Sequence, residues 1–244
     1  MKLATDVTHC DDLMRALQGF RGYAGPVLRH WGTLLASRLG SGSRLLVAGN
    51  GGSAAQAQHL TAELVGRYRD DRPAFSALAL HADTSSTTAI ANDYGVQEIF
   101  ARQVAAHGRA ADVLALLSTS GASANLLVAA SEAHRLGMTV LALTGPAPNP
   151  LADAADEALC VEAATSATVQ ELHLVAVHML CETFDQAVAR RETAHRRNRE
   201  GAARPGTTDR RYWSVATGGA PEEHHRPDER PGASWALLLE EDGT

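Results

Sequence analysis

Three short segments of the chain carry side chains whose types and spacing could do chemistry. The first reads GNGGSAAQAQHLTAE over residues 49–63, with glycines at its start and His59 and Glu63 four residues apart. Glycines let a ligand approach the backbone closely, and residues four apart lie on the same face of a helix. We expect that helix to begin near Ser53, which is a good N-cap residue. The alternative is an ordinary surface His and Glu on an amphipathic helix.

The second segment, LSTSGAS over residues 117–123, gathers hydroxyl groups around a glycine. We expect it to connect a strand to a helix, where backbone N–H groups and the positive end of the helix dipole favour a phosphate group. No P-loop lysine and no GxGxxG motif accompany it, which disfavours a nucleoside triphosphate or a dinucleotide. A phosphomonoester of a small molecule fits best. The alternative is a serine-rich turn that only caps the helix.

The third segment, TVQELHLVAVHML over residues 168–180, predicts a mostly buried helix. Gln170 and His178 are eight residues apart, about two turns, and lie within roughly 80° of each other around the helix axis. A histidine on an apolar helix is more often a hydrogen-bonded core residue than a ligand, and we interpret His173 in that way. Taken alone, Gln170 and His178 would carry no functional prediction.

The elements that must position these segments alternate between apolar runs and helical stretches. Five runs lack polar alternation, as expected of strands buried on both faces of a parallel sheet. They cover residues 44–49, 75–80, 112–118, 138–145 and 157–162. The helical stretches cover residues 53–66, 97–107, 122–136 and 168–190. This alternation predicts an α/β fold with a parallel sheet and right-handed crossovers, in which ligands bind beyond the carboxyl ends of the strands.

The two ends of the chain differ from this pattern. Residues 9–38 predict helix, with a break at Gly25-Pro26. We place one domain over residues 1–190. Residues 191–244 carry dense mixed charge, glycine and proline with few apolar anchors. We expect them to form a disordered tail, because they cannot bury enough surface to offset the entropy of ordering.

The composition limits the classes of function. The formal net charge of −6 argues against a general nucleic-acid binder, which needs clustered Lys and Arg. Three scattered cysteines without a CxxC pair argue against a disulfide framework or a thiolate zinc site, and they fit a reducing cytoplasm. No apolar stretch approaches the ~18 residues of a membrane span. We therefore expect a cytoplasmic protein that acts on neither membranes nor nucleic acid.

The ordered set of motifs resembles the sugar isomerase (SIS) domain family. The motifs are GNGGS followed by HxxxE, then Asn92-Asp93-Tyr94-Gly95, then STSGxS, and finally VQExH with a later histidine. The resemblance covers about residues 10–190 and is strongest to family members that isomerise sedoheptulose 7-phosphate. It implies a five-stranded parallel sheet flanked by helices. It also implies N-terminal helices that build a homotetramer with active sites shared between subunits.

The resemblance also implies roles for individual residues. The residues that match substrate-binding positions are Asn50, Gly51, Gly52, Ser53, Glu63, Asn92, Asp93, Ser118, Thr119, Ser120, Ser123 and Gln170. Those that match the ligands of one Zn²⁺ per subunit are His59, Glu63, Gln170 and His178. Glu63 and His178 also match the acid–base pair, although a carboxylate held by zinc is a poorer base. Ala122 and Thr168 depart from the commonest pattern, which has Asn and Arg there.

The implied reaction is an aldose–ketose isomerisation. Sedoheptulose 7-phosphate would become D-glycero-D-manno-heptose 7-phosphate, or an epimer, through an enediol intermediate. The stereochemistry at C2 and the pathway that uses the heptose stay open. The alternative within the family is a non-catalytic adaptor that binds the replication initiator protein, but such adaptors typically lack the late histidine that this chain keeps as His178. Sugar-phosphate-sensing relatives usually carry a helix-turn-helix segment, and the sequence shows no sign of one.

Overall fold

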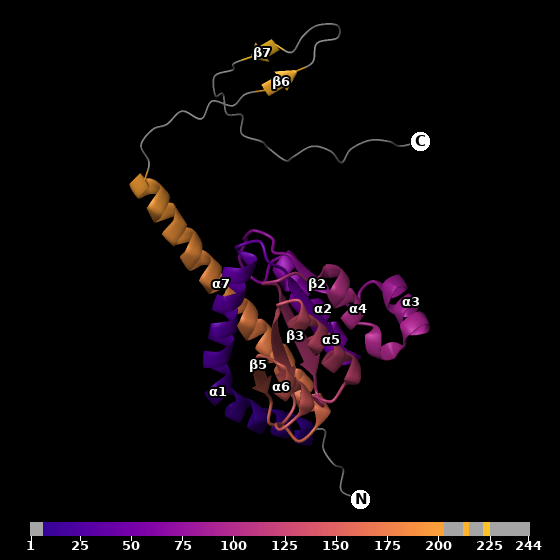
Figure 1. Cartoon of the computed structure of the whole chain (residues 1–244). Coiled ribbons are helices and arrows are strands. Elements are labelled where there is room, and N and C mark those ends of the chain that lie inside the picture. Colours follow the sequence, from indigo (N-terminus) through magenta and orange to yellow (C-terminus); the bar gives the residue numbers. More distant parts are fainter. Residues whose placement is uncertain (1–6, 203–211, 215–221, 225–244) are drawn as a thin grey trace, which may run out of the picture. The chain divides into compact units, whose positions relative to one another are not determined.

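The computed structural model describes residues 7–202, 212–214 and 222–224. The chain consists of two units, residues 1–195 and 196–244. The first unit contains a sheet of five parallel strands (Figure 1). The strands are β1 (Leu45–Gly49), β2 (Ala77–Ala79), β3 (Val113–Ser118), β4 (Thr139–Thr144) and β5 (Glu157–Cys160). The predicted α/β fold with five parallel strands is confirmed.

The strand order is β2-β1-β3-β4-β5, so the chain reverses its direction of progress across the sheet after β2. Leu45 at the start of β1 pairs with Ala77 on one side and with Val113 on the other. Loops that follow β1 and β3 therefore diverge to opposite sides of the sheet. A crevice opens at such a switch point beyond the carboxyl ends of the two strands, and it is the usual ligand site of an open α/β sheet.

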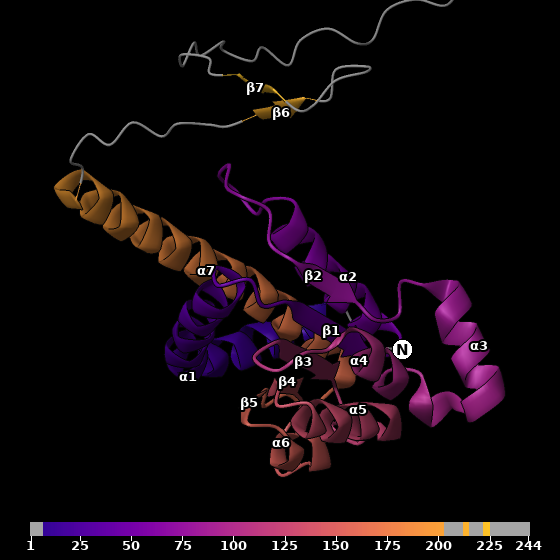
Figure 2. The same ribbon diagram turned by 45° about the horizontal axis from the view of Figure 1, so that its top comes forward.

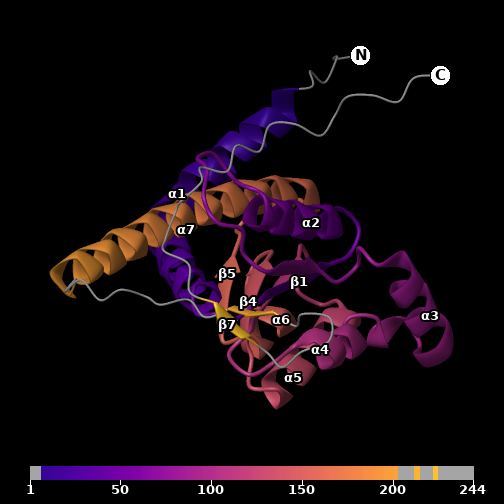
Figure 3. The same cartoon turned by 90° about the horizontal axis from the view of Figure 1, so that it is seen from above.

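Helices cover both faces of the sheet (Figures 1 and 3). The helices are α1 (Val7–Leu39), α2 (Gly52–Val65), α3 (Thr84–Tyr94), α4 (Ala101–His107), α5 (Ala124–Arg135), α6 (Pro150–Ala154) and α7 (Ser166–Ala202), with a 3₁₀ turn at Val96–Glu98. Core residues of α1, α2 and α7 pack with one face of the sheet, and those of α4, α5 and α6 pack with the other. Leu45 and Val47 face the first layer while Leu46 and Ala48 face the second, which explains why the β1 run is apolar without alternation.

The predicted break at Gly25-Pro26 is wrong, because α1 continues through Pro26 as a single helix. Proline in a helix interior costs about 3 kcal/mol. Here a continuous seam of buried side chains offsets that cost; its members recur at three- and four-residue spacing and are Phe20, Ala24, Leu28, Trp31 and Leu35. Figures 1 and 3 show α1 bending along its length, as a proline in a helix predicts. The expected set of N-terminal helices is therefore one bent helix.

Helices α1 and α7 approach each other closely at Gly32. A Cβ added at Gly32 would overlap the backbone of Phe184 and the side chain of Thr183. The Thr183 hydroxyl donates to the carbonyl of Leu28 at 2.9 Å. Glu157 at the start of β5 accepts a hydrogen bond from the Trp31 ring nitrogen at 2.7 Å. These contacts fix α1 against α7 and against the edge of the sheet.

We expected the disordered tail to begin at residue 191, but helix α7 continues to Ala202. In the second unit, Tyr212–Ser214 (β6) and Glu222–His224 (β7) form a short antiparallel pair, visible in Figure 2. Most of the expected disordered tail lies outside the described residues. Within the described part of the chain, no helix combines the length and hydrophobicity that crossing a membrane requires.

Candidate active site

The first two sequence motifs meet at the switch point of the sheet. The side chain amides of Asn50, just after β1, and Asn125, in the first turn of α5, exchange two hydrogen bonds of 3.0 and 2.9 Å. Gly49 and Leu117 near the ends of their strands are paired neighbours, so the two loops begin next to each other before they diverge. The sequence analysis did not single out Asn125. Its signal is an amide placed directly after the serine-rich turn, where a helix begins.

The glycine turn after β1 leads into α2 within one residue of the predicted start near Ser53, but another residue caps the helix. Gly51 has φ +55° and is the N-cap, so α2 begins at Gly52 and the prediction of Ser53 as the cap is wrong. The positive φ allows the tight reversal, and an L side chain would be strained there. Ser53 instead lies buried in the turn, packs against Gly49, and donates its N–H to the carbonyl of Asn50 at 3.0 Å.

The next glycine serves a contact between two helices. The Gln170 side chain of α7 lies directly over Gly52, in space that a Cβ at that position would occupy. The Gln56 side chain of α2 donates to the carbonyl of Gln170 at 2.5 Å. The space over Gly52, where we expected a ligand to approach the backbone, is therefore occupied in this chain by Gln170, which is itself one of the predicted site residues.

Helices α2 and α7 bring the predicted acid–base residues together. The Nε2 atoms of His59 and His178 lie 3.0 Å apart. The Nε2 of His59 also lies 3.4 Å from the Glu63 carboxylate, as the four-residue spacing predicts. The Glu63 side chain is 18% exposed and that of His59 is 40% exposed, so both are partly shielded and still reachable by a ligand. The Tyr68 ring stacks on His178 with centroids 5.8 Å apart.

The donor types in this cluster fit zinc, whereas their arrangement fits it in part. In the described part of the chain, no three or more His, Cys, Asp and Glu side chains form a group that could hold a metal ion. The cluster consists of two contacts that share His59, at 3.0 and 3.4 Å. Those separations lie close to the roughly 3.3 Å between neighbouring donors of a tetrahedral zinc ion with bonds of about 2.0–2.1 Å. Two of the three pairs therefore lie at zinc-like separations, whereas the three side chains do not together form a metal-holding group in this chain.

The serine-rich turn after β3 gathers two further hydroxyls around that of Ser118. The Ser118 hydroxyl lies 3.5 Å from that of Ser120 and 3.4 Å from that of Ser123, and it accepts the N–H of Gly121 at 3.0 Å. Ser123 is the N-cap of α5, but its side chain makes no capping hydrogen bond. N–H groups in the first turn of α5 therefore have no side-chain acceptor, which suits them to bind an anion. Thr119 and Ser123 are partly exposed and Ser120 is exposed.

Two predicted substrate-binding residues stand apart from the cluster. Asn92 and Asp93 lie on α3, are exposed, and hydrogen-bond to each other at 2.7 Å. No residue of α3 is buried. Figures 1, 2 and 3 agree in placing α3 at the outer edge of the domain. Within the described part of one chain, these two side chains form no hydrogen bond or ion pair with the other predicted site residues.

His173 belongs to the core, as interpreted from the sequence. It is fully buried, and its Nε2 hydrogen-bonds to the carbonyl of Thr144 at 3.0 Å. Burial lowers the pKa of His173, and the bond to Thr144 opposes this effect. His173 is therefore held as a neutral core residue and adds no charge to the site.

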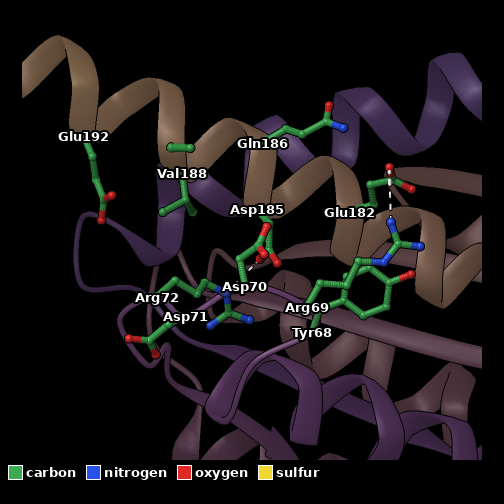
Figure 4. A pocket seen from close by; sticks show the side chains of 11 residues that line it. Tyr68, Arg69, Asp70, Asp71, Arg72, Glu182, Asp185, Gln186, Val188 and Glu192 are labelled. Atoms are coloured by element: carbon green, nitrogen blue, oxygen red, sulfur yellow. Dashed lines mark hydrogen bonds and ion pairs between the residues drawn. The ribbon is translucent and has the colours of Figure 1, made fainter.

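A cavity of about 290 Å³ lies beside the cluster, between the connection that follows α2 and the middle of α7 (Figure 4). Its lining contains Tyr68 and Arg72 from the connection and Glu182 and Asp185 from α7. None of the predicted site residues lines it. We therefore place the active site at the His59, Glu63 and His178 cluster, where the chemical groups converge, and not in this cavity.

Comparison with known proteins identifies the family to which the chain is similar. The SIS domain family model matches residues 10–145. A phosphoheptose isomerase of Streptomyces coelicolor is 71% identical over 186 residues, which are 76% of this chain and 80% of the relative. The structure of a phosphoheptose isomerase from Francisella tularensis superposes with a TM-score of 0.71 at 37% identity, covering 73% of this chain and 95% of the other. That of Neisseria gonorrhoeae gives 0.70 at 38% identity, covering 74% and 96%.

Proposed function

The chain belongs to the SIS domain family of phosphoheptose isomerases, and we propose that it converts sedoheptulose 7-phosphate into an aldoheptose 7-phosphate for heptose biosynthesis. The product is D-glycero-D-manno-heptose 7-phosphate or an epimer. The observation that carries the proposal is the meeting of His59, Glu63 and His178 from two helices beside the switch point of the sheet. The alternative of a non-catalytic adaptor is not supported, because the relatives named above are isomerases.

The phosphate group of the substrate would bind in the serine-rich turn. Hydroxyls of Ser118, Thr119, Ser120 and Ser123 would donate to it, together with N–H groups at the start of α5. The Asn50 and Asn125 pair connects this turn to the glycine turn after β1. An open-chain sugar bound by its phosphate in the serine-rich turn could therefore extend past the Asn50–Asn125 pair toward α2.

The proton transfer would use Glu63 as the base. Glu63 would remove a proton from C1 of the ketose to give a cis-enediol, and return a proton to C2 to give the aldose. His178 would move a proton from the oxygen on C1 to the oxygen on C2, so that the reaction is balanced without any added reductant. General acid–base groups of this kind contribute about 10²–10⁴-fold to a rate. The Tyr68 ring stacks on His178 and would help to orient the imidazole.

We also propose one zinc ion per subunit, held by His59, Glu63, Gln170 and His178. The support is that His59 lies at zinc-like separations from both His178 and Glu63, with the Gln170 amide held over the start of α2. When bound, zinc would supply Lewis-acid polarisation of the oxygens of the sugar. Glu63 cannot act as a strong metal ligand and as a free base at the same moment, so its two roles belong to different stages of the cycle.

A homotetramer with active sites at the subunit interfaces is the assembly that we propose. Large apolar side chains of α1 are exposed in the single chain, among them Val7 (55%) and Met14 (56%). Helix α3 has no buried residue, yet it carries Asn92 and Asp93. A neighbouring subunit would bury these faces and could place α3 of one chain near the cluster of another. Light scattering coupled to size exclusion would test it, and a monomer would contradict it.

We propose that the enzyme works in the cytoplasm. All three cysteines, Cys10, Cys160 and Cys181, are free. Free thiols, one of them exposed, suit a reducing compartment.

The function is tested by incubating the purified protein with sedoheptulose 7-phosphate, with and without added zinc, and separating the sugar phosphates by chromatography. We expect an aldoheptose 7-phosphate from the wild type and at least about 10²-fold less from Glu63→Gln and from His178→Gln. A wild type that forms no aldose under any metal condition would contradict the proposal. The position of the aldose against authentic epimers would also identify the stereochemistry at C2.

A further inference from the structure

The connection between α2 and β2, residues 66–76, holds an arginine that links the two helices of the active site. Arg72 makes hydrogen bonds to both helices and lies in the wall of the cavity in Figure 4. Its side chain is only 7% exposed, although the residue belongs to a surface connection. Burying a guanidinium costs free energy unless its N–H groups find hydrogen-bond acceptors. The acceptors of Arg72 therefore indicate its role.

One side of Arg72 caps the carboxyl end of α2. Its Nη2 donates to the carbonyl of Glu63 at 2.5 Å, and its Nη1 donates to those of Leu64 at 3.0 Å and Gly66 at 3.4 Å. The last carbonyls of a helix have no partner within the helix and carry its negative dipole end. A cation that binds them therefore fixes the last turn of α2, which includes the backbone of the proposed base.

The other side of Arg72 is attached to α7. Its Nε donates to the Asp185 carboxylate at 2.7 Å, an ion pair that Figure 4 shows as a dashed line. Its guanidinium also lies over the rings of Phe75 and Phe184, 5.5 and 5.4 Å from their centroids. The Asp185 side chain is 21% exposed, so water screens this pair less than an open surface pair. The Arg72 side chain is thus held by the two aromatic rings as well as by its hydrogen bonds.

The position of Asp185 on α7 connects the Arg72–Asp185 ion pair to the active site. Asp185 follows His178 by seven residues, about two turns, and therefore lies on the same side of the helix. Arg72 thereby joins the turn that carries Glu63 to the side of α7 that carries His178. The separation of Glu63, His59 and His178 depends on how these two helices are spaced and rotated.

We propose that Arg72 is a positioning residue for the isomerase reaction, which clamps the end of α2 to α7 and so sets the alignment of Glu63 with His178. This inference rests on the proposed function of the same site. The hydrogen bonds and ring contacts of Arg72 are to backbone carbonyls, to Asp185 and to two aromatic rings, and none is to the side chain of Glu63, His59 or His178. Lysine would not replace it, because an ammonium lacks the planar fork that binds a helix end and a carboxylate together.

The test compares kcat and KM for sedoheptulose 7-phosphate in Arg72→Met, Arg72→Lys and Asp185→Asn, at a temperature well below each variant's thermal midpoint. Arg135→Met is the matched control, because Arg135 also donates through two nitrogens to a carboxylate, that of Glu132, but lies on α5 on the other side of the sheet. Working below the midpoint keeps every variant folded, so a loss of stability alone does not change kcat.

We expect Arg72→Met to lower kcat by about 100-fold, the cost of misplacing a catalytic group by about 1 Å. KM should change by less than about 3-fold, because the phosphate-binding turn lies on β3 and α5 and does not touch Arg72. Arg72→Lys should fall between Arg72→Met and the wild type, and Arg135→Met should match the wild type. A folded Arg72→Met with the wild-type kcat would overturn the inference.

Asp185→Asn keeps the proposal testable if Arg72→Met does not fold. This variant leaves the cap on α2 in place and removes only the charge that ties it to α7. We expect a fall in kcat of roughly 10-fold with KM unchanged, and a wild-type kcat would overturn the clamp. If the clamp is wrong but the proposed function is right, the wild type and Arg135→Met are active and Asp185→Asn keeps their kcat. If the wild type itself is inactive, both the proposed function and the clamp are overturned.

Discussion

Substitution of Gly52 by alanine should remove activity while leaving the fold intact. An added Cβ would lie 2.7 Å from both Cδ and Oε1 of Gln170 and closer still to Nε2. Non-bonded carbon atoms prefer separations of about 3.5–4.0 Å, so the Gln170 amide must move by about 1 Å. A displacement of this size at a substrate-positioning or metal-binding group costs about 100-fold in rate.

The free energy of unfolding should change little in the same variant. Alanine gains up to about 1 kcal/mol over glycine in a helix, and the atoms that it displaces belong to the end of a flexible side chain. We therefore expect the unfolding free energy of Gly52→Ala, measured in urea, to stay within about 1 kcal/mol of the wild type. In a Gln170→Ala background, where the overlap is absent, the same substitution should stabilise by up to about 1 kcal/mol.

Gly19→Ala is the matched control, because Gly19 is also helical and a Cβ there would meet no atom within 4 Å. It should keep the wild-type kcat. If Gly52→Ala retains kcat within about 3-fold of the wild type, the Gln170 side chain is not a positioned part of the site and the reasoning is refuted.

Three further outcomes follow from the contacts. Asn125→Ala leaves the Asn50 amide without its reciprocal partner, and we expect KM to rise more than kcat falls in steady-state kinetics. Glu171 raises the pKa of His9 through a hydrogen bond, so the pair stabilises below about pH 6.5 and this contribution is lost as pH rises through the raised value. His9→Gln should therefore lower the thermal midpoint at about pH 5.5 and not at about pH 9. Burial raises the pKa of the Cys181 thiol from 9.0 to about 12, so its contribution is complete below about pH 9 and declines above it as the unfolded chain ionises. Cys181→Ala should show a shallower fall of unfolding free energy between about pH 9 and 11.

The parts of the fold that the sequence predicts well are those where burial leaves a local pattern. The central strands β1, β3 and β4 are runs of apolar residues because both of their faces are covered. The edge strands β2 and β5 are only partly buried, and the predicted runs still located all five strands. Helix α3 was missed for the opposite reason. The stretch TSSTTAIANDY buries no residue within the chain and so shows no apolar stripe. The break predicted at Pro26 failed because a local rule was outweighed by packing along the whole of α1.

The candidate site divides in the same way. The four-residue spacing of His59 and Glu63 is local, and the structure places them on one face as expected. That Gln170 fills the space over Gly52, and that Arg72 joins the end of α2 to α7, depends on residues more than a hundred positions apart. Spacing along one helix cannot show which side chain of another helix lies against it.

The most direct test of the central claim is an NMR time course of the protein with sedoheptulose 7-phosphate in D₂O, beside Glu63→Gln. An enediol formed by Glu63 exchanges the abstracted proton with solvent, so the account predicts an aldoheptose 7-phosphate with deuterium at C2, and no such product from Glu63→Gln. Aldose without deuterium at C2, or equal turnover by Glu63→Gln, would contradict the assignment of Glu63 as the base.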